Sequence, residues 1–261
     1  MHAPVAPPIP IKLLLQAYRA GVFPMADDRE DSEVFWVEPR ERAILPLDGF
    51  HASRSLLKVL KQDRFDVTCD AAFGEVIRLC AAPRPDQPTS WISRRIEASY
   101  NALYAAGHAH SIECWRDGEL VGGLYGVAFD RVFCGESMYS HADNASKVAL
   151  AWLVAAMRRA GYRLLDCQFM TGHLGSLGAV PLPQADYVAK LAEARGKPLC
   201  SIPQAVAAFQ AEGAAGVTAG DGVAAGRRGA SASPSSPLSS SSAAAASSPG
   251  KLIAQSLTQT S

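Results

Sequence analysis

Three consecutive strand-like runs in the middle of the chain constrain its fold more than any other feature. They cover His110–Arg116, Glu119–Phe129 and Arg131–Tyr139, and only short polar connections separate them. Asp117-Gly118 at the first connection is a strong signal for a hairpin, because an aspartate–glycine pair adopts the positive φ angles that such turns need. Asp130 marks the second tight connection. The centre of the chain is therefore predicted to be a meander of strands.

Helices and shorter strands are predicted on both sides of this meander. Residues 11–20 form an amphipathic segment that ends at Gly21, a typical helix-stop signal, and Ser53 is a plausible N-cap for a helix that runs to Lys61. This order of elements favours an α+β fold rather than a doubly wound sheet. The remaining segments are predicted as strands at Val34–Trp36, Ala43–Leu45 and Arg163–Gln168, and as helices at Ala71–Ala81, Ser93–Ala106, Asp186–Ala194 and from an Asn144 cap to Ala160.

The composition divides the 261 residues into three parts. We expect a small N-terminal α/β portion with a basic helix over residues 1–92, and the meander with its helices over residues 93–208. Residues 209–261 are expected to be a disordered tail, since the run from Gly213 to Gly250 is dominated by Ala, Ser, Gly and Pro and has no aromatic residue. Such a run buries too little apolar surface to offset its ordering entropy.

Charge and cysteine usage exclude several classes of protein. The 25 basic and 25 acidic residues balance, so any contact with nucleic acid must come from a local patch. The six cysteines form no C-x-x-C pair, which predicts buried thiols in a reducing compartment. His108 and His110 share one strand face without a third ligand, so no metal is expected. No apolar stretch reaches the roughly 18 residues that span a bilayer, and the proline-rich segment Met1 to Pro10 has no secretory h-region, so a cytoplasmic protein is expected.

Acidic and amide side chains stand among apolar neighbours in two of the strand-like runs. Glu136 lies between Phe133 and Met138, and Asp166 and Gln168 close another apolar run. A buried carboxylate is costly unless it is hydrogen-bonded, so each needs a structural partner or a substrate. Asp166 and Gln168 are two residues apart on a strand, which predicts that both project from one face. Taken alone, the pair could meet loop amides at a strand end, and Glu136 could cap the following turn.

Two further features suit RNA. Trp91 follows a proline-rich loop, and an indole in this place either anchors the core or stacks on a base. Arg54, Lys58 and Lys61 recur along one helical face, at a spacing that suits phosphates but is also found on solvated helices. Neither feature decides the function by itself.

Side by side, these segments resemble the leucyl/phenylalanyl-tRNA–protein transferase family. The resemblance spans about residues 11–195, and several long motifs in the same order make it specific. The matching segments are Tyr18-Arg19-Ala20-Gly21-Val22-Phe23-Pro24, His51-Ala52-Ser53-Arg54-Ser55, Trp91-Ile92, Gly107 to Glu113, Glu119 to Val127, Cys134 to Ser140, Asn144-Ala145-Ser146-Lys147, Leu165-Asp166-Cys167-Gln168 and Ser176-Leu177-Gly178-Ala179.

The resemblance implies an aminoacyltransferase that needs no cofactor. It would move Leu or Phe, and Met less well, from aminoacyl-tRNA to proteins that begin with Arg or Lys, which marks them for degradation by the N-degron (N-end rule) route. The implied fold is similar to that of the coenzyme-A-dependent acetyltransferases, so residues 93–208 are expected to be a GNAT-like core with a mixed or antiparallel sheet flanked by helices. Aminoacyl-tRNA and the acceptor proteins are the expected partners of a monomer that binds no membrane.

The resemblance also implies roles for individual residues. Asp166 and Gln168 would be catalytic. Our own hypothesis for their chemistry is that Asp166 orients Gln168, whose carbonyl oxygen accepts a proton from the attacking amine. Glu136 would pair with the cationic first side chain of the acceptor. Trp91 would stack on the terminal adenosine. The tRNA would lie on Arg54, Lys58 and Lys61, and the aminoacyl side-chain pocket would be lined by Leu124, Phe133, Met138, Leu150, Leu153 and Leu165.

The family's motifs begin almost at once in this chain, without the usual longer N-terminal extension, and the Ala/Ser-rich tail has no expected counterpart in the family. Two further departures fall within the motifs. Many members have Trp where this chain has Met25, which puts a stacking contact in doubt. Some members carry Asn-Asp where Thr171-Gly172 precede His173 here, so the loop could bind the acceptor differently.

Two other functions compete with this interpretation. A coenzyme-A-dependent N-acyltransferase would need a glycine-rich turn that opens a helix, whereas Gly122-Gly123 and Gly126 lie within a strand-like run. An RNA-binding module would use Trp91 and the basic stripe, but it leaves Glu136 and the Asp166/Gln168 pair unexplained.

Overall fold

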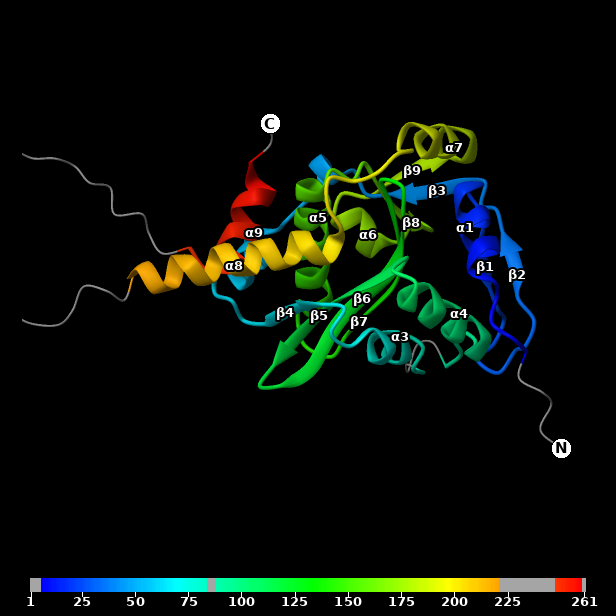
Figure 1. Ribbon diagram of the computed structural model, residues 1–261, viewed down its shortest axis with the longest axis horizontal. Helices are drawn as coiled ribbons and strands as arrows, with labels where there is room; N and C mark the ends of the chain where they lie inside the picture. The colour runs from blue at the N-terminus through cyan, green and yellow to red at the C-terminus, as the bar shows by residue number, and fades with distance from the viewer. Residues whose placement is uncertain (1–5, 84–87, 221–246, 260–261) are drawn as a thin grey trace, which may run out of the picture.

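A seven-stranded sheet, in the order β4-β5-β6-β7-β8-β3-β9, organises the molecule (Figure 1). The computed structural model describes residues 6–83, 88–220 and 247–259. Neighbouring strands pair antiparallel except β7 and β8, which run parallel. The strands are β3 (Glu41–Ile44), β4 (Asp66–Cys69), β5 (Ala109–Arg116), β6 (Glu119–Phe129), β7 (Val132–Ser140), β8 (Leu164–Gln168) and β9 (Val180–Pro183).

The predicted meander is confirmed as β5, β6 and β7. Asp117 and Gly118 have φ angles of 53° and 80°, and Asp130 has 51°, so both connections use the left-handed conformations that their sequences favour. The one parallel pair follows from α5 (Ala145–Ala160), since parallel neighbours need a crossover connection. A mixed sheet flanked by helices is therefore confirmed as the core of an α+β fold.

Helices cover both faces of the sheet (Figure 1). On one face, α5 packs with α2 (Arg54–Lys61), α8 (Ile202–Gly220) and α9 (Pro249–Thr258). The other face carries α3 and α4, with α1 and α7 packed in the same apolar cluster. The remaining elements are α1 (Ile11–Arg19), α3 (Phe73–Cys80), α4 (Arg94–Ala105), α6 (Gly172–Ser176), α7 (Gln184–Glu193), a 3-10 turn η1 (Leu47–Gly49), and a separate two-stranded sheet of β1 (Phe23–Met25) and β2 (Phe35–Val37).

Two residues were predicted as helix N-caps, and only one of them caps its helix through its side chain. Ser53 is the N-cap of α2 as predicted, because its side chain accepts a hydrogen bond from the backbone N–H of Leu56. Asn144 precedes α5 as predicted, but its side chain caps nothing. Its φ angle of 70° places it in the left-handed region, where it turns the chain into the helix instead.

The prediction of a disordered tail over residues 209–261 is wrong at both ends of that segment. Helix α8 continues to Gly220, and α9 packs against α2, α5 and α8. Ile253 and Leu257 of α9 are buried, and Phe209 meets Trp152 of α5 edge-on at 6.4 Å between ring centroids. These two helices have few apolar residues, but those residues lie on the faces that pack against α5, so they bury enough apolar surface to hold the helices in place. The middle of the predicted tail, residues 221–246, lies outside the described residues.

The predicted boundary at residue 92 stays a prediction. Strands β3 and β4 precede it and the other strands of the sheet follow it, so one sheet takes strands from both sides. Within the part of the chain that the structure describes, no helix has the length and apolar character to cross a membrane.

Candidate active site

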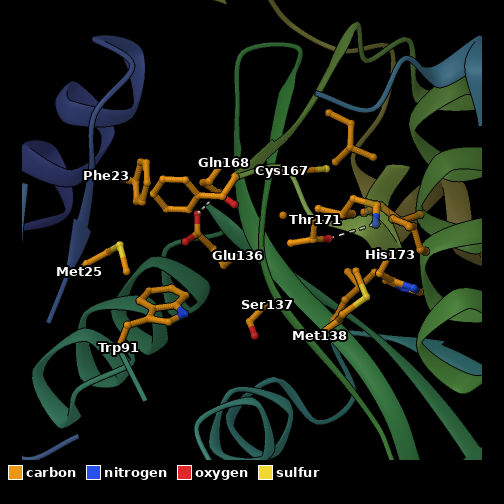
Figure 2. A pocket seen from close by; sticks show the side chains of 17 residues that line it. Phe23, Met25, Trp91, Glu136, Ser137, Met138, Cys167, Gln168, Thr171 and His173 are labelled. Atoms are coloured by element: carbon orange, nitrogen blue, oxygen red, sulfur yellow. Dashed lines mark hydrogen bonds between the residues drawn. The ribbon is translucent and has the colours of Figure 1, made fainter. Parts of the chain in front are cut away.

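A pocket of about 330 Å³ opens beside the middle of β7 and the end of β8 (Figure 2), a size that suits a small ligand. Its walls come from segments far apart in the chain, namely β1, the loop before α4, the strands β6 to β8, the helix α5 and the loop that leads into α6. The lining residues are Phe23, Met25, Trp91, Leu124, Gly135, Glu136, Ser137, Met138, Leu150, Leu153, Leu165, Cys167, Gln168, Phe169, Thr171, His173 and Leu174.

The apolar end of the pocket matches most of the predicted side-chain pocket. Leu124, Met138, Leu150, Leu153 and Leu165 all line it. Phe133 does not line it, so that prediction is wrong. Its side chain is fully buried and fills the space over Gly126, where an added Cβ would come within 2.4 Å of the Phe133 ring.

A β-bulge in β7 explains how one strand supplies both ends of the pocket. Tyr125 of β6 pairs with Ser137, whereas the next residue, Gly126, pairs with Gly135, so Glu136 is an extra residue in β7. A bulge re-aims the side chains that follow it. Glu136 reaches the face that carries α1 and α4, and Met138, two residues later, packs on the α5 face.

Glu136 stands at the polar end of the pocket among three hydrogen-bond donors. Its Oε1 accepts from the Tyr18 hydroxyl at 2.7 Å and from Nε2 of Gln168 at 3.3 Å, and its Oε2 accepts from the Tyr100 hydroxyl at 3.0 Å. Burial raises the pKa of Glu136 to about 7, although the bonds from the two tyrosines oppose the shift. Glu136 is therefore held in place by the core and yet lines the cavity, rather than capping a turn.

Asp166 lies beneath the pocket rather than in its wall. The carboxylate is fully buried, and Arg42 binds it with two hydrogen bonds, from Nε to Oδ1 at 2.8 Å and from Nη2 to Oδ2 at 2.6 Å. The Tyr187 hydroxyl donates to Oδ2 at 3.1 Å. Asp166 does not line the cavity, so any part it takes in catalysis would act through Gln168, and its catalytic role stays a prediction.

Gln168 is the member of the predicted pair that lines the pocket. Its backbone N–H donates to Oδ1 of Asp166 at 3.0 Å, so Asp166 holds the main chain of Gln168 rather than its amide group. The φ angle of Gln168 is 57°, a left-handed value that ends the alternation of the strand. The two side chains consequently do not share one cavity, and the amide of Gln168 turns toward Glu136 (Figure 2).

Trp91 lines the pocket beside Met25, on the side away from His173 (Figure 2). Both departures from the family pattern thus fall at the pocket, since Thr171 and His173 also line it. Thr171 caps the short helix α6, where its Oγ1 accepts from the N–H of Leu174 at 3.1 Å. Burial, together with the charge of Lys147, lowers the pKa of His173.

The predicted basic stripe does not line the pocket. Arg54, Lys58 and Lys61 are exposed on α2. Nδ1 of His110 bonds to the Asp70 carboxylate oxygen Oδ2 at 2.7 Å. The described residues contain no group of three or more His, Cys, Asp or Glu side chains arranged for a metal ion. All six cysteines are free thiols, three of them buried.

The glycines of β6 serve close packing. An added Cβ at Gly122 would come within 2.4 Å of the Ala145 Cβ, and one at Gly126 within 2.2 Å of the Cys134 carbonyl oxygen. These glycines lie inside a strand and open no helix, so they form no cradle for the pyrophosphate of coenzyme A.

Sequence reasoning missed the residues that hold the site from behind. Tyr18 is part of the first family motif, which could have suggested it, and Tyr100 and Tyr187 carried no signal beyond helical spacing. Arg42 stands in the charged run Arg40-Glu41-Arg42, where nothing distinguishes a buried cation from a solvated one.

Comparison with known proteins decides the family. A sequence model described as leucyl/phenylalanyl-tRNA protein transferase matches residues 44–192, and one for the N-terminal domain of the same proteins matches residues 9–40. The chain belongs to the leucyl/phenylalanyl-tRNA–protein transferase family. The two models meet near residue 42, whereas our predicted boundary is at residue 92.

Individual transferases of this family are similar along most of the chain. The protein from Novosphingobium aromaticivorans is 57% identical over 261 residues, which cover 97% of each chain. The one from Rhizorhabdus wittichii is 61% identical over 184 residues, 70% of this chain and 74% of that protein. Among solved structures, a GCN5-related N-acetyltransferase-like protein from Streptococcus suis has 15% identity and a TM-score of 0.28 over 72% of this chain and 63% of that one, too low to support an argument about fold.

Proposed function

We propose that this aminoacyltransferase moves Leu or Phe from aminoacyl-tRNA to the α-amino group of proteins that begin with Arg or Lys, and that the pocket beside β7 and β8 is where the transfer takes place. The observation that supports this most is the division of one cavity into two ends. Leucine and methionine side chains line one end, and a buried carboxylate bonded to an amide lines the other.

The apolar end would hold the side chain that is esterified to the tRNA. Leu124, Met138, Leu150, Leu153 and Leu165 offer no polar group, so Leu and Phe are favoured over polar residues. A β-branched side chain fits such a slot less well. One misplaced methyl group is worth roughly 1 to 3 kcal/mol, so the discrimination should be partial, and Met should be accepted less well.

The polar end would receive the acceptor. Glu136 supplies a negative charge close to the cavity, which attracts a cationic N-terminal residue. Gln168 supplies the contact to the amine: because its Nε2 donates to Glu136, its carbonyl oxygen is left to accept a hydrogen bond. An acceptor amine that donates to this oxygen would have its lone pair turned toward the ester.

The reaction would be aminolysis of the ester. The amine nitrogen bonds to the carbonyl carbon, and the bond from that carbon to the ribose oxygen breaks. The amine proton leaves by way of Gln168 to water or to the ribose hydroxyl beside the ester, which passes a proton on to the leaving ribose oxygen. An α-amino group with a pKa near 8 is partly neutral in the cell, so a strong base is not required. Positioning of amine and ester, worth on the order of 7 to 11 kcal/mol in favourable systems, is the main task of the enzyme.

The tRNA would be held by stacking and by charge. Trp91 offers an aromatic face for the terminal adenosine, and Arg54, Lys58 and Lys61 offer an exposed stripe for phosphates. We further propose that residues 93–208 form a GNAT-like core, and the antiparallel meander followed by one crossover helix supports this. The proposal also includes a cytoplasmic location and a monomeric state.

The transfer is tested by incubation of the protein with labelled leucyl-tRNA and a peptide that begins with Arg, followed by mass analysis of the peptide. We expect a mass increase of one leucine residue at the N-terminus. The same peptide with an acetylated N-terminus is the matched control and should stay unmodified. Transfer from acetyl-CoA in place of leucyl-tRNA, with none from the tRNA, would contradict the proposal.

A further inference from the structure

Arg42 is the largest of the fully buried side chains in the described part of the protein, and it has no place in the chemistry set out above. We propose that Arg42 is a positioning residue for aminoacyl transfer, which fixes the ends of β1 and β8 that form two walls of the pocket. The inference rests on the proposed function, because it assigns Arg42 a role in the same reaction.

The guanidinium group of Arg42 contacts three separate elements. Nε and Nη2 bind the carboxylate of Asp166 on β8, and Nη1 donates to the Gly21 carbonyl oxygen, just before β1, at 3.2 Å. The group is also enclosed by two rings, with the centroid of Phe23 at 4.5 Å and that of Tyr187 at 4.6 Å from Cζ. A planar guanidinium with fixed donors suits this arrangement, whereas the single ammonium of lysine could not reproduce it.

From Arg42, one line of contacts leads to Gln168. Oδ1 of Asp166 accepts both from Nε of Arg42 and from the backbone N–H of Gln168. That backbone hydrogen bond supports the left-handed conformation of Gln168, which a residue with a side chain adopts only at a cost. Without Arg42, Asp166 would be a buried charge without its cation and would have to move or bind a proton, and Gln168 would lose a fixed partner.

From Arg42, a second line of contacts leads to Phe23. The Phe23 ring lies over the guanidinium and meets the ring of Phe169 edge-on at 5.7 Å, and both rings line the pocket. Arg42 therefore ties the β1 wall and the end of β8 to the same rigid group. Replacing a buried ion pair by apolar residues is often neutral for stability, so stability alone does not account for such a cation.

The test compares Arg42→Gln, Arg42→Lys, Asp166→Asn and the double variant Arg42→Gln/Asp166→Asn with the natural protein. We expect Arg42→Gln to lower kcat about 10-fold to 100-fold, as small misplacements of reacting groups do, while the affinity for uncharged tRNA changes less than about threefold. Arg42→Lys should recover only part of kcat. The double variant should lose no more than the worse single one, because both changes break the same link.

A second measurement does not depend on activity. Hydrogen exchange of the backbone amide of Gln168 should be at least about tenfold faster in Arg42→Gln and in Arg42→Lys, because its acceptor Asp166 is no longer held. Arg19→Ala is the matched control: Arg19 also pairs with an aspartate, Asp130, and lies over a phenylalanine ring, but it is half exposed and does not line the pocket. Its kcat and its Gln168 exchange should equal those of the natural protein.

Unchanged exchange at Gln168 in the Arg42 variants, or additive losses of kcat in the double variant, would overturn the inference. Should Arg42→Gln fail to fold, Arg42→Lys and Asp166→Asn decide by the same two measurements. A natural protein that transfers nothing from leucyl-tRNA would refute the proposed function, and the exchange result would still show whether Arg42 fixes Gln168.

Discussion

The side-chain amide of Gln168 donates to the carboxylate of Glu136 at 3.3 Å, and this bond joins the end of β8 to the bulge of β7. The two residues are far apart in the chain, and only the parallel pairing of β7 with β8 brings them together. The bond gives each residue a defined orientation at the cavity. Substitutions at Glu136 and at other residues of the cavity are therefore expected to alter different properties of the enzyme.

Glu136→Gln should reduce the preference for acceptors that begin with Arg or Lys. The variant keeps the size of the side chain but loses its charge, so peptides with a cationic first residue lose an attractive interaction. We expect kcat/KM for an Arg-first peptide to fall about tenfold or more, the size of effect when one charged hydrogen bond is lost, and to fall less for a Met-first peptide. The ratio of the two rates by mass analysis checks this. An unchanged ratio would contradict the role given to Glu136.

Glu136 should make the protein less stable as the pH rises toward neutrality. Burial raises its pKa in the folded state to about 7, above the ordinary value of 4.5, so the folded protein holds a proton that the unfolded chain has already released. Its contribution is fully present below pH 4.5 and is lost as the pH rises to about 7. The loss amounts to about 3 kcal/mol at most.

The Glu136→Gln variant isolates this contribution. The free energy of unfolding in urea, measured from pH 4.5 to 8 for both proteins, should fall with pH in the natural protein relative to the variant. A constant difference between the two curves would contradict the raised pKa.

Leu153→Ala should shift the choice of aminoacyl group toward Phe. The substitution enlarges the apolar end of the pocket, which then fits a leucyl group less tightly than a phenylalanyl group. We expect the ratio of kcat/KM for phenylalanyl-tRNA to that for leucyl-tRNA to rise about 10-fold, within the range of one or two methyl groups. Phe133→Leu is the matched control, since Phe133 is buried outside the cavity: it should lower the melting temperature and leave the ratio unchanged.

Lys58→Ala should weaken tRNA binding and its dependence on salt. If Lys58 contacts a phosphate, its loss lowers the slope of log K against log salt concentration by about 0.7 to 0.9. Lys190→Ala serves as control, because Lys190 lies on α7, which packs on the opposite face of the sheet from α2. Equal slopes for all three proteins, from titrations at several salt concentrations, would remove α2 from the tRNA surface.

Ile253→Ala should destabilise the protein although it lies in a segment of low complexity. Ile253 is fully buried in α9 against the α5 side of the core, and a buried Ile to Ala change costs about 2 to 5 kcal/mol. Gln255→Ala on the exposed side of α9 should change stability by less than about 0.5 kcal/mol. The free energy of unfolding in urea, measured for both variants, checks this. Equal values for the two variants would mean that α9 contributes nothing to stability.

The sequence predicted elements that local signals define and missed those that depend on distant partners. The meander followed from Asp117-Gly118 and Asp130, and α2 from its Ser53 cap. β1, β4 and β9 are only three or four residues long, too short to show a period. Helix α9 was missed because composition alone does not reveal that its few apolar residues meet α5.

Within the site, too, local motifs were predictable from the sequence and contacts between distant residues were not. Family motifs predicted Glu136, Gln168, Trp91 and five of the six residues of the apolar end, all of which line the cavity. The support of Asp166 by Arg42 joins residues that are 124 positions apart, and no local pattern announces it. The sequence therefore predicted the residues that face the cavity, was wrong about Phe133, and did not show how Asp166 is held beneath the cavity.

The pocket depends on the number of residues in β7, because the extra residue of the bulge is Glu136. A point substitution at Glu136 changes one side chain, whereas loss of that codon would remove the bulge and restore regular pairing of β7 with β6. Met138 would stay opposite Leu124, but β7 would have no residue left at this point to project into the polar end of the cavity. Lineages of this transferase should therefore tolerate replacement at this position far better than deletion.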